Sequence, residues 1–179
     1  MTGIAGRHVV LGVSGGIACY KSCTLARRLT EAGVSVDVVM TAAATEFVRP
    51  LTFEALTGRP VVTSLWEPGR ALDHIRLSSE PHLIVVAPAT AQLVARMAQG
   101  LADDFLTAML LARKVPLLLC PAMNDRMYSH PETQANLNRL VKQQAGRLQV
   151  LGPATGPLAH GEGEGPGRMV EPEEIAAWV

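Results

Sequence analysis

The residues best suited to chemistry stand just after an apolar run. Residues 121–128 have the sequence Pro-Ala-Met-Asn-Asp-Arg-Met-Tyr and follow the run from Val115 to Cys120. Asn124 supplies an amide whose NH2 group donates to a carboxylate and whose oxygen accepts a hydrogen bond, and Met123 offers a soft apolar contact. A polar turn after a buried strand has the same composition, so this stretch alone favours a turn over a binding site.

A second candidate is the turn Ser14-Gly15-Gly16, which lies between the run Val9–Val13 and helical periodicity over Ile17–Ala32. This order places backbone N–H groups at a helix N-terminus, where they suit a phosphate. The turn lacks the dinucleotide pattern G-x-G-x-x-G, and no acidic residue ends the next strand, residues 34–40, where it would bind ribose. The sequence therefore favours a mononucleotide over NAD, although glycine turns also occur merely to begin helices.

Small residues and hydroxyls follow two further strands. Thr41 comes after strand 34–40, and Thr90 ends Ala87-Pro88-Ala89-Thr90 after a strand at 83–87. Either hydroxyl could donate to a phosphate, although capping the next helix is the default role. Asp103 and Asp104 open a helix over 105–113 as ordinary helix-dipole partners, and could also accept hydrogen bonds from a heterocycle.

The histidines and cysteines give weaker signals. A lone histidine is more often a surface or capping residue than a base, and His74 differs only in preceding the strand at 83–87. The three cysteines are an odd number without framework spacing, which indicates a reducing compartment. Cys19 and Cys23 lie one helical turn apart, but no further Cys/His cluster completes a metal site. We expect packed thiols and no metal.

The elements that must position these residues alternate along the chain. Predicted strands cover 9–13, 34–40, 61–65, 83–87, 115–120 and 148–151. Predicted helices cover 17–32, 50–56, 91–98, 105–113, 131–145 and 172–178. Alternation of buried strands with helices predicts an α/β domain with a mostly parallel sheet, whose ligands bind beyond the carboxyl ends of the strands. A glycine-rich stretch at about 154–169 inside such a domain is usually a mobile flap over a site.

Composition excludes several classes of function. The 179 residues make one domain, and with 48% hydrophobic and 18% charged residues we expect other subunits to cover apolar surface. Sixteen basic residues balance sixteen acidic ones, so charge gives no case for nucleic acid or an anionic membrane. The sequence shows neither a signal segment nor a membrane-spanning run, and a cytoplasmic protein is expected.

Together these motifs resemble one family over essentially the whole chain. They are Gly12–Ala18 with Tyr20-Lys21, His74-Ile75, Ala87–Ala91, Gly100–Asp104, Pro121–Met127, and Gly161 with Gly165–Met169. In order and spacing they are similar to the homo-oligomeric flavin-containing cysteine decarboxylases. Each motif is weak alone, but their combination is specific.

The resemblance implies a Rossmann-like, three-layer α/β fold of flavodoxin type over residues 1–179, binding FMN near a subunit boundary of a trimer or dodecamer. The residues that it places at FMN are Gly12, Ser14, Gly15, Gly16, Thr41, Phe53, Pro88, Ala89, Thr90, Ala102, Asp103 and Met123. In bacterial relatives a phosphopantothenate–cysteine ligase domain follows at the position where this sequence ends, so such a domain, fused or separate, is an expected partner.

The most similar branch of the family converts 4′-phosphopantothenoylcysteine, a small thiol carboxylate, to 4′-phosphopantetheine in coenzyme A biosynthesis. Decarboxylation alone would leave an unstabilised carbanion. Oxidising the thiol to a thioaldehyde on FMN supplies an electron sink, CO2 leaves, and the enethiol is then reduced. By resemblance His74 is the base and Asn124 aligns the substrate carboxylate. Substrate-binding residues carried over in this way are Asn124, Met127, Ala159, Gly161 and Glu162.

One residue departs from the pattern. Many enzymes of this branch carry a flap cysteine, linked to reduction of the enethiol, where this sequence has His160. Our hypothesis is that His160 replaces it as proton donor; the opposite hypothesis is that turnover stops at the enethiol. The alternatives are a peptidyl-cysteine decarboxylase acting on a ribosomal peptide, or a non-catalytic FMN-binding protein. A flavin prenyltransferase is disfavoured by the pairing of His74 with Asn124.

Overall fold

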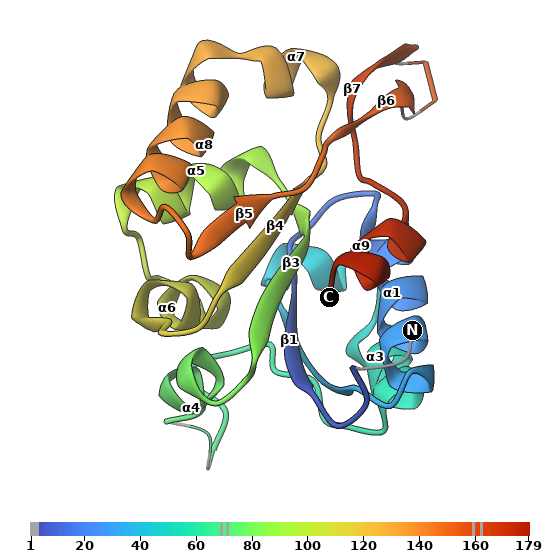
Figure 1. Cartoon of the computed structure of the whole chain (residues 1–179), viewed down its shortest axis with the longest axis vertical. Helices are drawn as coiled ribbons and strands as arrows, with labels where there is room; N and C mark the ends of the chain where they lie inside the picture. The colour runs from blue at the N-terminus through green and yellow to red at the C-terminus, as the bar shows by residue number, and fades with distance from the viewer. Residues whose placement is uncertain (1–3, 69, 71, 159, 162) are drawn as a thin grey trace.

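A five-stranded parallel sheet between two layers of helices forms the body of the chain (Figure 1). The computed structural model describes residues 4–68, 70, 72–158, 160–161 and 163–179. The strands are β1 (His8–Val13), β2 (Ser35–Met40), β3 (Leu83–Ala89), β4 (Leu117–Pro121) and β5 (Leu148–Val150). Their order is β2-β1-β3-β4-β5, with every neighbouring pair parallel. This is the flavodoxin-like order, which confirms the predicted fold class.

Helices cover both faces of the sheet. The helices α1 (Cys19–Glu31), α3 (Pro50–Thr57) and α9 (Pro172–Trp178) pack on one face. The helices α4 (Asp73–Ser79), α5 (Ala91–Gln99), α6 (Phe105–Ala112) and α8 (Pro131–Gln143) pack on the other. Two short helices, α2 (Ala42–Thr45) and α7 (Asp125–Ser129), follow the ends of β2 and β4.

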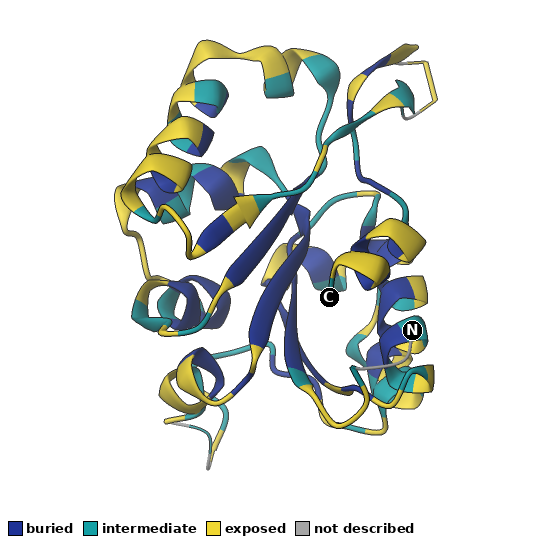
Figure 2. Cartoon of the chain, viewed as in Figure 1, coloured by how far each residue is buried: buried dark blue, intermediate teal, exposed yellow. Residues whose placement is uncertain are grey.

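Both faces of the sheet are apolar because both are covered. Along β1, Val9, Leu11 and Val13 belong to one core cluster while Val10 belongs to the other. The central strands are accordingly buried throughout (Figure 2). This burial explains why these strands appear in the sequence as continuous apolar runs, and not as an alternation of apolar with polar residues.

Two local predictions need correction. The predicted strand at 61–65 is wrong, since Val62 makes only an isolated bridge to Val39 beside the edge strand β2. The backbone N–H of Thr63 donates instead to the carboxylate of Glu67, and the chain turns away from the sheet. The helix α7 was not predicted, because its five residues are too few to show a period.

The glycine-rich stretch forms an antiparallel hairpin of β6 (Ala154–Pro157) and β7 (Glu164–Arg168). The hairpin stands apart from the main sheet, beyond the carboxyl ends of its strands (Figure 1).

Among the described residues, no helix combines the length and the apolar character that a membrane span needs, and no group of side chains could hold a metal ion. Cys19 and Cys120 are packed thiols, as predicted, and burial raises the pKa of Cys120 to about 12.

A buried carboxylate on β2 makes stability depend on pH. Asp37 accepts hydrogen bonds from His8 Nε2 at 2.7 Å and from Arg59 Nε at 2.6 Å. Burial alone would raise the pKa of Asp37, but the hydrogen bonds from Arg59 and His8 and the charges of these partners lower it overall. Because the folded pKa lies below the unfolded one, ionised Asp37 stabilises the fold above the unfolded pKa, and this stabilisation is lost as pH falls through the folded value.

We therefore expect Asp37→Asn to lower the free energy of unfolding at pH 7 by about 2 kcal/mol. The difference from the parent should shrink as pH falls below about 4, the ordinary pKa of aspartate in an unfolded chain, because the stabilisation by ionised Asp37 is lost between that value and the lower folded pKa. Urea denaturation at several pH values measures both. Glu31→Gln, which breaks an exposed pair with Arg27, is the matched control and should cost under about 0.5 kcal/mol. A difference at Asp37 that does not change with pH would contradict this account.

Candidate active site

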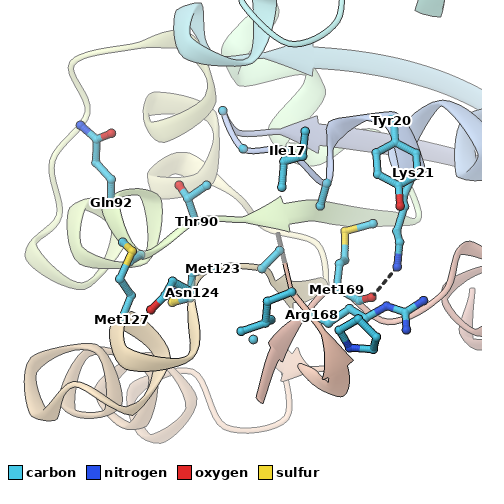
Figure 3. A pocket seen from close by; sticks show the side chains of 18 residues that line it. Ile17, Tyr20, Lys21, Thr90, Gln92, Met123, Asn124, Met127, Arg168 and Met169 are labelled. Carbon is cyan, nitrogen blue, oxygen red and sulfur yellow. Dashed lines mark hydrogen bonds between the residues drawn. The ribbon is translucent and has the colours of Figure 1, made fainter. Parts of the chain in front are cut away.

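A cavity of about 500 Å³ lies beyond the carboxyl ends of β1, β3 and β4, under the β6–β7 hairpin (Figure 3). Cavities of this size hold drug-sized molecules and cofactors. The position is the switch point between β1 and β3, where the direction of chain winding reverses. The lining residues are Gly15, Gly16, Ile17, Ala18, Tyr20, Lys21, Thr90, Ala91, Gln92, Ala122, Met123, Asn124, Met127, Pro157, Leu158, Gly167, Arg168 and Met169.

Ser14 holds together the two loops that flank the switch point. Its hydroxyl donates to the carbonyl of Pro88 at 2.7 Å and accepts from the backbone N–H of Thr90 at 3.0 Å. Ser14 is buried at 2% exposure, so these partners replace the water that its hydroxyl has lost. Gly15 lies directly against α2, where a Cβ atom would come within 2.5 Å of the Ala43 side chain. A larger residue at position 15 would therefore displace the loop.

The N-terminus of α1 opens toward the cavity. The cap residue Ala18 has no side-chain acceptor, and Gly15, Gly16 and Ala18 all line the cavity wall. Within the described part of the chain, no hydrogen bond uses the N–H groups of Gly15, Gly16 or Ile17. Such groups at the start of a 13-residue helix suit a phosphate.

The turn after β4 forms the opposite wall. Asn124 caps α7 by accepting a hydrogen bond from the Arg126 N–H through its Oδ1 at 2.9 Å, while its side chain lines the cavity. The N–H of Met123 donates to the carbonyl of Gly167 at 2.9 Å, which ties β7 to this turn. Gly167 has φ of 150° and sits directly against the Met123 carbonyl, so a Cβ atom there would collide with backbone. The hairpin is thus fixed to the cavity wall along β7.

The structure places six of the nineteen predicted site residues at the cavity. Predicted residues that line the cavity are Gly15, Gly16, Thr90, Met123, Asn124 and Met127. Others stand behind the wall at the ends of β1 and β3: Gly12, Ser14, Pro88 and Ala89. Thr41 caps α2 and Phe53 is fully buried in the core. Ala102 and Asp103 are exposed before α6 and outside the cavity, where Asp103 pairs with Arg96.

Both predicted histidines lie outside the cavity of their own chain. The His74 ring, on α4, meets Phe105 edge-on with centroids 6.3 Å apart. Its Nδ1 is buried without a hydrogen-bond partner among the described residues. His160 and Gly161 are exposed in the turn between β6 and β7. The predicted substrate residues Ala159 and Glu162 lie outside the described residues.

Sequence reasoning missed two charged residues of the cavity. Lys21 and Arg168 belonged only to the quoted motifs, with no role assigned. Lys21 is 6% exposed, and its Nζ donates to the carbonyl of Met169 and to Glu171, each at 3.0 Å. The available signal was a lysine on the face of a predicted helix that packs on the core. Its partners lie about 150 residues away, so sequence alone could not supply them.

The fold and the cavity define an α/β protein of flavodoxin-type strand order with a cavity at its switch point. Residues 2–179 match the model of the flavoprotein family, and the chain belongs to that family. The bifunctional coenzyme A biosynthesis protein CoaBC of Vibrio cholerae is 49% identical over 179 residues, covering 99% of this chain and 44% of the relative. CoaBC of Mycolicibacterium smegmatis is 48% identical, covering 96% and 40%. The chain thus spans less than half the length of these relatives.

Solved structures agree with the family. A mutant PPC decarboxylase complexed with pantothenoylaminoethenethiol superposes with a TM-score of 0.81 at 26% identity, covering 96% of this chain and 95% of that one. The FMN-dependent cysteine decarboxylase SpaF gives 0.78 at 29% identity, covering 98% and 96%. The FMN-binding protein AtHal3 gives 0.79 at 28% identity, covering 96% and 94%.

The Ser14 contacts lead to a stability prediction that is independent of any ligand. Ser14→Ala removes the buried hydroxyl and leaves the Thr90 N–H without this partner, so we expect a loss of about 1–3 kcal/mol in the free energy of unfolding. Chemical denaturation without added ligand measures the loss. Ser79→Ala, at an exposed position of α4, is the matched control and should change stability by less than about 0.5 kcal/mol. Equal effects at the two serines would contradict the bridging role.

Proposed function

We propose that this chain is an FMN-dependent carboxy-lyase that decarboxylates 4′-phosphopantothenoylcysteine to 4′-phosphopantetheine in coenzyme A biosynthesis. The observation that carries the proposal is that the Pro-Ala-Met-Asn turn faces the glycine loop across one cavity. The 46–49% identity to CoaBC proteins over nearly the whole chain supports the same activity. A ligase partner, fused or separate, and a cytoplasmic location belong to this proposal.

The residues present suit FMN. The cavity is large enough for a flavin, its glycine loop offers N–H groups for a phosphate, and its position is the one at which flavodoxin-type sheets bind FMN. Ile17, Thr90 and Met123 would contact the cofactor from three loops. Bound FMN would supply an acceptor for two electrons from the substrate thiol and a donor that returns them.

Asn124 has the geometry of a positioning group for the substrate carboxylate. Its Oδ1 is held by the Arg126 N–H, which fixes the amide plane and leaves the NH2 end to donate to an anion. Holding the carboxylate lets the bond to CO2 align with the π system that develops as it breaks. Met127, Leu158 and Met169 give the cavity apolar walls, which limit the access of water to the reacting carbon.

His74 acts as base in this proposal only if it serves the cavity of a neighbouring copy, because it lies outside its own. Exposed apolar side chains occur both at the cavity and beside His74. Ile17 and Tyr20 at the cavity are 67% and 60% exposed, and Leu72 and Ile75 beside His74 are 75% and 49% exposed. A homo-oligomer, trimer or dodecamer, that joins these surfaces would cover them and place His74 near a second cavity.

Mixed oligomers test that arrangement. His74→Asn and Asn124→Ala should each reduce decarboxylation by about a hundredfold or more. When the two variants are co-expressed with different tags and isolated as mixed oligomers, random assembly gives about a quarter of the sites both residues, and activity should return to that extent. The control pairs His74→Asn with the double variant and should stay inactive. No recovery in the first mixture would place His74 and Asn124 in one subunit's site, or His74 in no site.

His160 is proposed to protonate the substrate carbon as the enethiol is reduced. It is exposed on the hairpin turn, and an imidazole side chain can donate a proton. The competing possibility is a peptidyl-cysteine decarboxylase that releases an enethiol. The absence of the flap cysteine favours this alternative. A third possibility is an FMN-binding protein without activity.

Product mass separates these possibilities. The flavin-loaded protein is incubated anaerobically with 4′-phosphopantothenoylcysteine, and we expect loss of CO2 alone. His160→Ala should shift the product toward loss of CO2 and two hydrogens with a bleached flavin, while His160→Cys should restore loss of CO2 alone. If the parent itself yields the enethiol, His160 does not complete the reaction and the peptide-modifying function gains support. An unchanged substrate mass beside bound FMN would sink both enzymatic proposals.

A further inference from the structure

The charge of the cavity is one-sided. Among its described lining residues only Lys21 and Arg168 are charged, and both are basic. Figure 3 shows them together on one side, while Asn124 and Met127 lie on the other. The wall between them is formed by small, apolar and neutral polar residues. The cavity therefore offers a cationic end and an amide end, separated by a neutral surface.

Glu171 neutralises only part of the cationic end. Its carboxylate accepts hydrogen bonds from Lys21 Nζ and from Arg168 Nη2. The hydrogen bond from Lys21, with the charges of Lys21 and Arg168, lowers the pKa of Glu171, so the group is ionised at neutral pH. One carboxylate between two cations leaves one net positive charge at this end of the cavity.

Arg168 projects from backbone that is held on both sides. Gly167 before it packs on the Met123 carbonyl, and the carbonyl of Met169 after it accepts from the buried Lys21. The Arg168 side chain lies along β6, with Nη1 at 3.2 Å from the position of a Cβ at Gly156. A guanidinium carries five donors in a rigid fork, and the hydrogen bond from Arg168 to Glu171 uses one nitrogen, Nη2. Such a group matches the oxygens of a phosphate monoester better than a lysine does.

We propose that Arg168 is the residue by which this site selects a substrate carrying a terminal phosphate monoester. The proposal rests on the proposed function, and it names the part of the substrate that the cationic end binds. A molecule with a cysteine carboxylate at one end and a phosphate at the other matches the amide end and the cationic end of the cavity. A cysteine peptide has no phosphate for Arg168 and would gain nothing from this contact.

Binding to the flavin-loaded protein tests the subsite without turnover. Calorimetry compares 4′-phosphopantothenate with pantothenate, which differ only in the phosphate. The parent should bind the phosphorylated compound more tightly. Arg168→Gln should weaken that binding by about 10- to 100-fold and change pantothenate binding by less than about twofold, because a hydrogen bond to a charged group is lost only with phosphate present. Arg168→Lys should give an intermediate loss, since it keeps the charge but not the fork.

Turnover gives a second readout, with 4′-phosphopantothenoylcysteine and its dephosphorylated form as substrates. Arg168→Gln should lower kcat/KM for the phosphorylated substrate by a similar factor and leave the other unchanged. Arg28→Gln is the matched control, because Arg28 also forms an ion pair with a glutamate but stands outside the cavity. It should leave kcat/KM for each of the two substrates as in the parent.

Three results would overturn the proposal. Parallel losses for both ligands would give Arg168 a purely structural role, and unchanged binding would give it none. If Arg168→Gln loses FMN but prefers the phosphorylated substrate as strongly as the parent does, the guanidinium binds the flavin phosphate instead. If the parent converts neither substrate but binds the phosphorylated ligand through Arg168, the proposed reaction fails and the phosphate subsite stands.

Discussion

The hydrogen bonds of one buried hydroxyl hold the site in shape. The direction of chain winding reverses between the parallel strands β1 and β3, which leaves a crevice there, and contacts beyond the strand ladder hold the two loops together across it. Ser14 does so by donating to Pro88 and accepting from Thr90. The N–H groups at the start of α1 therefore face the β3 loop at a fixed distance. The cavity is preorganised by backbone and hydroxyl contacts that no ligand has to create.

A second set of contacts carries this order from the sheet to the hairpin. Lys21 follows the glycine loop by one helical turn, and it binds the Met169 carbonyl and Glu171 at the far end of β7. Gly167 meanwhile rests on the turn that presents Asn124. The glycine loop, the turn that presents Asn124 and the β6–β7 hairpin are thus connected through short contacts. His160 stands beyond these contacts, exposed between β6 and β7.

Exposed apolar side chains occur near both the cavity and His74. Large exposed side chains stand at the cavity mouth and on either side of His74, and others lie elsewhere on the surface. Oligomerisation of the kind proposed would bury both and would complete a site that one chain leaves open. In that arrangement the same contacts would stabilise the fold and assemble the chemistry, because covering Ile17 and Tyr20 would also close the cavity mouth.

The sequence by itself determined the fold class and the three loops of the site. Continuous apolar runs in β1, β3 and β4 indicate strands buried on both faces, and ligands bind where such strands end. The roles predicted for Gly15 and Asn124 then follow from the local chemistry of a glycine turn and of an amide side chain. Only the tertiary structure decided that His74 lies outside its own cavity, that Asp103 pairs with Arg96, and that Lys21 meets Glu171. The physical reason is that period and turn chemistry are local, whereas these contacts join residues from separate elements and depend on how the layers pack.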